Sequence, residues 1–495
     1  HAEALPSPSD PTPLQNDQMV GFIRFGNDFT QNFYQVEIPL KVTPEGASSP
    51  SEVWPELNEI NLSLDLLTQL KVLALGGNAP AEDINGIRFI DDDVLDPSLA
   101  TNTSRGKLRL GIRGNPNFGL VRTLMVGVKN KATNDSAIRG EVWFNELRLA
   151  EMDNEGGMAA VVSLDTNLAD LATVSASSKK STVGFGALEQ GPNERSREDV
   201  KQYDIVSNFN VGQILPKKWK LNLPFNYAVG EQIITPKYDP SFQDLELKEV
   251  IAAESNQDKK AEIQNRAIDY TKRTSVNFIG VKKERGDKQK QHFYDVENIT
   301  LSYSFNEMLH HDFQVENLVD QQQKTSLDYA YSFKAKSIEP FKKNKFFKKN
   351  GYYKAISDFN FNFLPSNVTF NSNITRQFNR QQFRLIDVQG IGLDPLYRRN
   401  YFFNYQYGVN FPITKSLKLN YTAANNNIVR NYFDTQNNPI NDLDIWNDYW
   451  NFGTANTHNQ QITANYDLPI NKIPVLSFIK SSYIYTGDYS WQRAS

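Results

Sequence analysis

After Met158 the sequence alternates with a period of two residues. From Trp219 to Val229 every odd position is apolar or aromatic, whereas the even positions are Lys, Asn, Pro, Asn and Ala. Alternate side chains of a β-strand point to opposite faces, whereas a helical face repeats every 3.6 residues. The pattern therefore predicts about fourteen strands in roughly 340 residues, each with one apolar and one polar face. Further examples are segments 203–211, 299–305, 327–333, 359–363, 368–378, 401–411, 417–421, 462–468 and 479–489.

The two faces of these strands also differ in residue type. The apolar faces are rich in the 31 Phe and 22 Tyr residues of the chain, and the opposite faces carry mostly Asn, Gln, Ser and Thr. Tyrosine near strand ends suits a membrane–water boundary, and uncharged polar groups suit a water-filled lumen. A soluble sheet with one solvated face alternates in the same way. Repetition over so many strands favours a membrane protein, and we predict a mainly β fold that is part of a very large antiparallel transmembrane β-barrel.

The alternation assigns individual residues to the two sides of this barrel. No run of about 18 apolar residues occurs, so a transmembrane helix is excluded, whereas a transmembrane strand needs only about 9 to 11 residues. The predicted lumen-facing residues are Lys220, Asn222, Asn226, Asn360, Asn362, Asn371, Asn373, Asn404, Gln406 and Asn410. The predicted lipid-facing residues are Trp219, Leu221, Leu223, Phe225, Tyr227, Phe359, Phe361, Phe363, Tyr401, Phe403 and Tyr405.

Changes in composition divide the chain into regions. The string LPSPSDPTP at 5–13 favours an extended connector, because proline fixes φ and has no N–H. A barrel in hydrocarbon cannot leave an unpaired edge, and this chain ends directly after an alternating strand, so we expect the remaining strands of the same barrel to lie elsewhere. The predicted domains are a Pro-rich linker (1–18), a jelly-roll-like β-sandwich with one short helix from Ser51 to Gly76 (19–150), and an incomplete barrel (151–495) with a helical insert at 239–267.

The composition argues against catalysis. The chain has no Cys and five His, which excludes thiolate metal sites and Cys nucleophiles and leaves little material for proton relays. His310 and His311 are neighbours on a predicted strand, so their side chains point to opposite faces and cannot easily share a metal ion. A net charge of -4 lacks the basic footprint of nucleic-acid-binding proteins. We therefore expect no enzyme activity, no cofactor, no metal site and no nucleic-acid partner.

Longer strings extend over nearly the whole chain in a fixed order. They are RFGNDFTQNFYQVEIPL (24–40), VRTLMVGVKN (121–130), GEVWFNELRL (140–149), DLATVSAS (170–177), GFGALEQ (184–190), DPSFQDLEL (239–247), YTKRTSVNF (270–278), IEPFKK (338–343) and FNFNFLPS (359–366). Together they resemble the SprA/Sov family, which comprises giant outer-membrane translocons of the type 9 secretion system in Bacteroidetes. The resemblance implies that the chain is an internal fragment of a much longer protein.

The resemblance also implies a function and a set of partners. It implies a protein-conducting pore for folded proteins at the outer membrane and cell surface of a Gram-negative bacterium, with gliding-motility adhesins among its cargo. The implied partners are secreted protein cargo, a PorV-type shuttle, plug proteins and outer-membrane lipid.

The residues themselves leave two other functions open. One is a plugged outer-membrane small-molecule importer, in which residues 19–149 would block the lumen. Such importers carry an energy-coupling box near the mature N-terminus, and the Pro-rich segment at 5–13 does not resemble one. The other is a secreted glycan-binding protein built of several sandwiches, which would be monodisperse in buffer without detergent.

Overall fold

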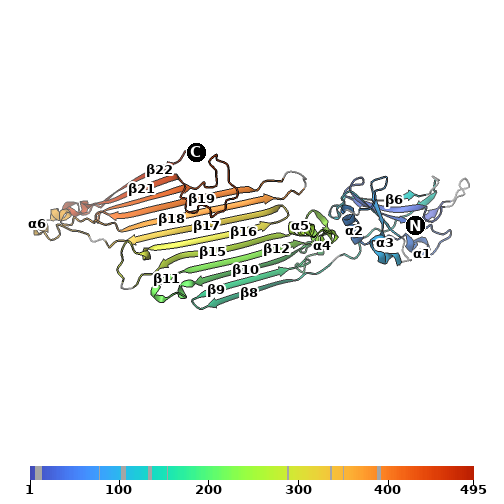
Figure 1. The fold of residues 1–495 in the computed structure, drawn as a ribbon, viewed down its shortest axis with the longest axis horizontal. Helices are drawn as coiled ribbons and strands as arrows, with labels where there is room; N and C mark the ends of the chain where they lie inside the picture. Colours follow the sequence, from blue (N-terminus) through green and yellow to red (C-terminus); the bar gives the residue numbers. More distant parts are fainter. Residues whose placement is uncertain are drawn as a thin grey trace. The chain divides into compact units, whose positions relative to one another are not determined.

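The computed structural model describes residues 1–5, 14–76, 79–101, 107–131, 137–152, 154–286, 289–334, 337–348, 351–386 and 392–494. These residues form a mainly β structure with antiparallel sheets, and they divide into two units (Figure 1). The first unit comprises His1–Ala159, Ser181–Asp199 and Ile234–Ile268, and the second comprises Ala160–Lys180, Val200–Ile233 and Asp269–Ser495. Among the described residues, no helix has the length and the apolar character needed to cross a membrane.

A five-stranded antiparallel sheet organises the first unit. Its strand order is β4-β5-β3-β2-β6. Strand β3 lies in the middle and turns the buried side chains of Tyr34, Val36 and Ile38 to one face. The strands are β2 (Met19–Gly26), β3 (Phe33–Pro39), β4 (Arg88–Asp91), β5 (Arg109–Arg113) and β6 (Thr123–Asn130).

The hydrophobic core of the first unit lies on that face of the sheet. Helix α2 (Leu64–Leu75) contributes the buried residues Leu66, Leu67 and Leu70 to the same cluster, and Ala2 joins it from the β1–β7 pair. Within the described residues, the second layer is thus a helix and a two-stranded pair. The arrangement is sandwich-like, and the described residues of this unit form no second large sheet of the kind predicted for a jelly roll.

The single helix expected between Ser51 and Gly76 is two helices in the structure. Helix α1 (Pro50–Val53) is capped by Ser49 and stops after one turn, and α2 begins after its own cap, Ser63. Pro55 explains the interruption, because proline has no N–H and disfavours the α conformation in the residue before it. Trp54 accordingly has φ −118° and ψ 77°. A short helix α3 (Asp92–Leu95) follows β4.

The predicted linker over 1–18 is only partly a linker. Ala2–Ala4 form strand β1, which pairs with β7 (Gly140–Val142). The prolines between residues 6 and 13 lie outside the described residues.

The helical insert predicted at 239–267 is part of the first unit. It consists of β13 (Tyr238–Asp239), β14 (Phe242–Glu246), α4 (Leu247–Ala253) and α5 (Gln257–Ala267). A salt bridge of 2.6 Å joins Lys71 of α2 to Asp244 of β14, and the two side chains are 2% and 1% exposed. Lys71 also donates to the carbonyl of Pro116 at 2.8 Å. Burial lowers the pKa of Lys71, against the opposing effect of the Asp244 carboxylate.

The second unit is built on one large sheet of thirteen strands. Along the path from β8 to β22 each strand pairs with the next in sequence, with the two-residue β11 beside β15. The strands are β8 (Ala159–Leu168), β9 (Ala172–Ser181), β10 (Glu198–Asn210), β11 (Leu221–Asn222), β12 (Pro224–Pro236), β15 (Asp269–Lys283), β16 (Ile299–His311), β17 (Val315–Ser332), β18 (Asn367–Phe383), β19 (Leu396–Pro412), β20 (Leu417–Ile428), β21 (Thr454–Leu468) and β22 (Ser481–Gln492).

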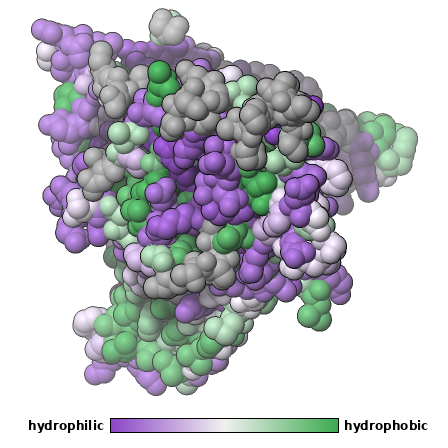
Figure 2. Space-filling view, turned by 90° about the vertical axis from the view of Figure 1, so that its right-hand side faces the viewer, coloured by the Kyte–Doolittle hydropathy of each residue, from purple (hydrophilic) through white to green (hydrophobic). Residues whose placement is uncertain are grey.

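The large sheet is open within the described residues, because its end strands β8 and β22 each pair on one side. Val161 and Val162 of β8 are 69% and 67% exposed, and Tyr483 and Ile484 of β22 are 59% and 65% exposed. Neighbouring residues of a strand face opposite ways, so both faces of these edge strands are bare. Figure 2 shows hydrophobic residues gathered in the lower part of that view and hydrophilic residues over much of the rest.

Two of the predicted strands differ in the structure. In the segment 219–229, Trp219 ends a 3-10 turn and Lys220 has a left-handed φ of 49°, and the main strand starts only at Pro224. In the segment 359–363, Phe361 makes an isolated bridge with Ile338, and the next strand begins at Asn367. Pro216 precedes the first segment, Pro224 lies within it and Pro365 follows the second. Proline cannot donate a ladder hydrogen bond, which explains why the alternation there does not become a continuous strand.

Candidate functional site: the two faces of the large sheet

Consecutive residues of β12 show how the large sheet separates two kinds of side chain. The Asn226 amide donates to Asn208 at 2.7 Å and accepts from Asn277 at 2.9 Å. The ring of Phe225 lies 6.0 Å from that of Phe209 and 4.8 Å from that of Phe278. Since neighbouring side chains of a strand point to opposite sides, amides meet amides on one face and rings meet rings on the other. We call these the polar face and the aromatic face.

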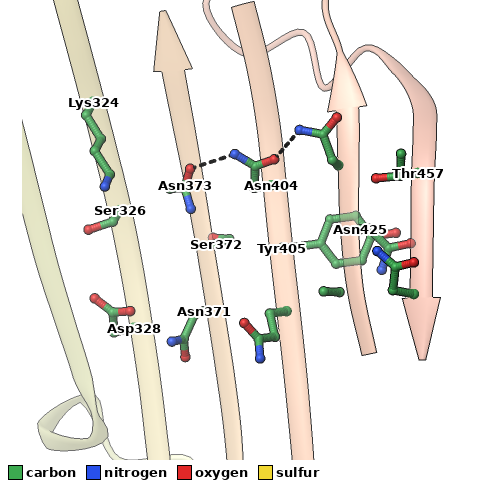
Figure 3. Close-up of a pocket in the computed structure, with 14 residues that line it drawn as sticks. Lys324, Ser326, Asp328, Asn371, Ser372, Asn373, Asn404, Tyr405, Asn425 and Thr457 are labelled. Carbon is green, nitrogen blue, oxygen red and sulfur yellow. Dashed lines mark hydrogen bonds between the residues drawn. The ribbon is translucent and has the colours of Figure 1, made fainter. Parts of the chain in front are cut away.

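Side-chain ladders cross the polar face from strand to strand. On β18, β19 and β20, Asn404 donates to Asn373 at 3.0 Å, and Asn426 donates to Asn404 at 2.6 Å (Figure 3). Each amide carries two N–H groups and a carbonyl oxygen with two lone pairs, so a member of the ladder keeps hydrogen-bonding capacity for water. A second ladder runs through Thr173, Asn208, Asn226, Asn277 and Ser304.

The polar face holds a hollow of about 460 Å³ over β17 to β21. Its charged side chains are Lys324 and Asp328, which have opposite signs on the same strand (Figure 3). The hollow therefore presents many hydrogen-bonding groups and little net charge. Its lining from the polar face consists of Lys324, Ser326, Asp328, Asn371, Asn373, Asn404, Gln406, Ala424, Asn426, Thr457 and Asn459, and the alternating residues Ser372, Tyr405 and Asn425 also line it.

Part of the aromatic face is mainly apolar, with Ser372 and Asn425 among its rings and aliphatic side chains. Cross-strand pairs bring Leu301 opposite Leu327 and Val368 opposite Val409, and Tyr421 lies opposite both Val409 and Ile462. We call this part the apolar band. Its members are Leu301, Leu327, Tyr329, Val368, Phe370, Ile374, Phe403, Tyr405, Tyr407, Val409, Tyr421 and Ile462.

The same face changes character further along the strands. Gln321 donates to the Glu307 carboxylate at 2.6 Å, Gln323 lies opposite Arg376, and Phe378 lies opposite Arg399. Strand β17 has 18 residues, whereas about 9 to 11 residues of a strand cross a bilayer. A sheet of this length can therefore carry a membrane-spanning band and a separate charged zone on one face.

The segment 429–453, between β20 and β21, covers this charged zone. The Arg376 guanidinium is 1% exposed and donates to the carbonyls of Ile445 at 2.8 Å, Asn447 at 2.7 Å and Asp448 at 2.5 Å. Its central carbon lies 4.9 Å from the Tyr401 ring centre, a cation–π contact. Carbonyls and ring faces thus solvate a buried charge, and the segment is fixed to the sheet.

The amino-terminal half of the chain matches a known protein family. Residues 1–251 match the family model SprA_N, described as motility related/secretion protein. The chain belongs to the SprA family. No curated protein matches the chain. The matched residues include the first unit up to residue 251 and the strands of the large sheet from β8 to β12, so both units of this SprA-family chain contribute to the match.

The structure brings several of the predicted lumen-facing residues together. Asn371, Asn373, Asn404 and Gln406 line the hollow, and Asn410 lies opposite Asn420 on the same face. Asn226 is in the second ladder, and Asn222 pairs with Lys282 through β11. Three predicted residues do not lie on a strand of the sheet: Lys220, Asn360 and Asn362.

The predicted lipid-facing residues separate into three groups. Leu221, Phe225, Tyr227, Phe403 and Tyr405 lie on strands, with Leu223 between β11 and β12. Trp219, Phe359, Phe361 and Phe363 do not lie on strands of the large sheet. Tyr401 is on β19 but is 2% exposed beneath the segment 429–453, so that segment, and not lipid, covers it.

Sequence reasoning missed Arg376, Lys324, Ser326 and Asp328. Lys324, Ser326 and Asp328 occupy the positions of β17 that alternate with Leu327. Extending the alternation from Leu327 would have predicted that they lie on the polar face. Arg376 occupies an aromatic-face position, and no local pattern reveals that residues 445–448 supply its partners. The described residues contain no group of three His, Cys, Asp or Glu that could hold a metal ion.

Proposed function

We propose that this SprA-family chain forms part of the wall of a protein-conducting translocon in the outer membrane, of the type 9 secretion kind. Its polar face borders the aqueous passage, and its apolar band contacts lipid. The family supports the coarser statement, a role in motility or secretion. The observation that carries the finer proposal is the open thirteen-stranded sheet with amide ladders on one face and an apolar band on the other.

The need to pair every backbone hydrogen-bonding group explains why such a sheet would be one section of a closed barrel wall. In hydrocarbon, each unpaired backbone N–H or C=O costs several kcal/mol, so a spanning sheet has to close on further strands. Strands β8 and β22 are 10 and 12 residues long and are the end strands of the sheet among the described residues, so the outer backbone edge of each can pair with a further strand. Further strands of the same barrel are the partners that this proposal requires.

The polar face, with few charges of mixed sign where it forms the hollow, suits the passage of varied proteins. Charged walls would retain cargo of opposite charge, whereas ladders of amides and hydroxyls keep the wall hydrated with little electrostatic attraction. Secreted proteins are thus the proposed cargo, and the cell surface is their destination. Shuttle and plug proteins of the kind implied by the family resemblance would bind elsewhere on the assembly.

Selective blocking of the polar face tests this function. The chain has no Cys, so Asn404→Cys introduces a unique thiol among these residues. Modification with a bulky water-soluble maleimide should reduce secretion in proportion to the labelled fraction, because the adduct would occupy the passage. Lys259→Cys on α5 is the control, since Lys259 is exposed and belongs to the first unit. Complete labelling of Asn404→Cys with unchanged secretion would contradict the proposal.

A further inference from the structure

Three loops at one end of the large sheet are strongly basic and aromatic, whereas the segment 284–298 between β15 and β16 at the same end carries charges of both signs. Residues 334–366, 412–416 and 469–480 connect β17 to β18, β19 to β20 and β21 to β22 at one end of the sheet. We call the described residues of these loops the loop platform. The three loop sequences contain eleven Lys and two carboxylates, Glu339 and Asp358, in a chain whose net charge is -4. Helix α6 (Lys345–Lys348) of the platform lies beyond the strand ends in Figure 1.

Contacts between the loops make the platform one surface. Lys415 binds Glu339 across two loops, and Lys472 binds Asp358 at 3.3 Å. The Asn362 amide donates to the carbonyl of Pro412 at 2.5 Å. Hydrogen bonds from Lys342 and Lys415 lower the pKa of Glu339 to about 2, so this carboxylate is ionised at neutral pH. Both carboxylates of the platform are therefore engaged by lysines.

Exposed lysines and exposed rings share the described surface of the platform. Lys343 and Lys354 are exposed. Phe346 is 65% exposed, Phe363 is 72% exposed and Phe478 is 80% exposed. Exposed rings beside ammonium groups are typical of surfaces that lie in the headgroup region, where a ring enters the acyl boundary and a lysine reaches a phosphate.

The position of the platform supports the same partner. Tyr329, Val368, Val409 and Ile462 are the apolar-band residues nearest to the strand ends from which the platform loops leave. If the band lies in hydrocarbon, as the proposed function requires, the adjoining loops meet the headgroups. The charged zone under segment 429–453 is at the opposite ends of the strands and carries no such basic excess.

We propose that the loop platform binds the phosphate groups of anionic lipid headgroups at the bilayer boundary. This inference rests on the proposed function, because the platform meets lipid only if the apolar band spans the bilayer. Each lysine near an anionic surface contributes roughly a fivefold gain in affinity, so removing two should weaken the preference for anionic lipid about 25-fold.

The test uses the intact protein reconstituted in phosphatidylcholine bilayers with one-tenth phosphatidylglycerol. After extraction, mass spectrometry measures the ratio of phosphatidylglycerol to phosphatidylcholine that remains bound. The variant is Lys343→Gln/Lys354→Gln, and the matched control is Lys259→Gln/Lys260→Gln on α5, which removes the same charge from the first unit. Enrichment of phosphatidylglycerol should disappear in the platform variant and persist in the control.

Three results would overturn the inference. Equal enrichment of phosphatidylglycerol in all three proteins, with normal insertion, would show that the platform does not bind anionic lipid. The proposed function would be unaffected by this result. Displacement of bound phosphatidylglycerol by inorganic phosphate at equal concentration would identify a site for free phosphate. Failure of the unaltered protein to insert would contradict both this inference and the proposed function.

Discussion

Replacing Lys71 with Met should lower the free energy of unfolding of the first unit by about 3 to 5 kcal/mol. The substitution leaves the Asp244 carboxylate, which is 1% exposed, without its ammonium partner. Such a carboxylate has to be neutralised or hydrated before the unit can keep its packing. Hydrogen exchange of the α2 and β14 amides in the purified protein measures the loss, because these elements carry the two partners.

Two further variants isolate the buried ion pair as the cause. Lys41→Met removes an exposed salt bridge to Asp17, whose side chains are 34% and 47% exposed, and should cost about 1 kcal/mol or less. Lys71→Met/Asp244→Asn should recover most of the stability, because a neutral amide can still accept the hydrogen bond of the Phe118 N–H. If Lys71→Met alone lowers the free energy of unfolding by less than about 1 kcal/mol, the ion pair does not stabilise the packing of the insert against α2.

Replacing Leu327 with Arg should destabilise the protein in a bilayer by about 2 to 4 kcal/mol. Leu327 is in the apolar band, opposite Leu301 on β16, so a guanidinium there would face hydrocarbon. The neighbouring Ser326→Arg is the matched control. Ser326 lines the hollow of the polar face beside Asp328, and its replacement should change the stability by no more than about 0.5 kcal/mol.

Equilibrium folding into vesicles over a denaturant series measures both variants. The account expects the two neighbouring substitutions to differ by at least about 2 kcal/mol, with Leu327→Arg the less stable. Equal costs would mean that both faces meet the same solvent. A larger cost at Ser326 would reverse the assignment of the faces.

The period of two was sufficient to predict the mainly β fold and the phase of most strands. Asn404 and Tyr405 fall on opposite faces as their alternation indicates, because one buried or lipid-exposed face fixes the phase of a strand. The alternation failed at Trp219 and at 359–363, where prolines interrupt the hydrogen-bond ladder. Apolar periodicity records which side chains share a face, but it does not record whether the backbone finds a neighbouring strand.

The contacts that depend on distant segments could not be predicted. Tyr401 continues the aromatic pattern of β19, yet the segment 429–453 folds over it and provides backbone carbonyls that accept hydrogen bonds from the terminal nitrogens of Arg376. Backbone carbonyls occur at every residue, so their role leaves no trace in the sequence. The Lys71–Asp244 pair is likewise separated by 173 positions, and neither residue is unusual in its local context.

The central claim is that water wets the polar face and lipid covers the apolar band. Single cysteines along β19 of the membrane-embedded protein test it most directly, through their reaction rates with a water-soluble maleimide. The account predicts fast reaction at Asn404, Gln406 and Asn410 and slow reaction at Tyr405, Tyr407 and Val409. Uniform rates along the strand, or protection of both sets as in the dry interior between two packed sheets, would contradict it.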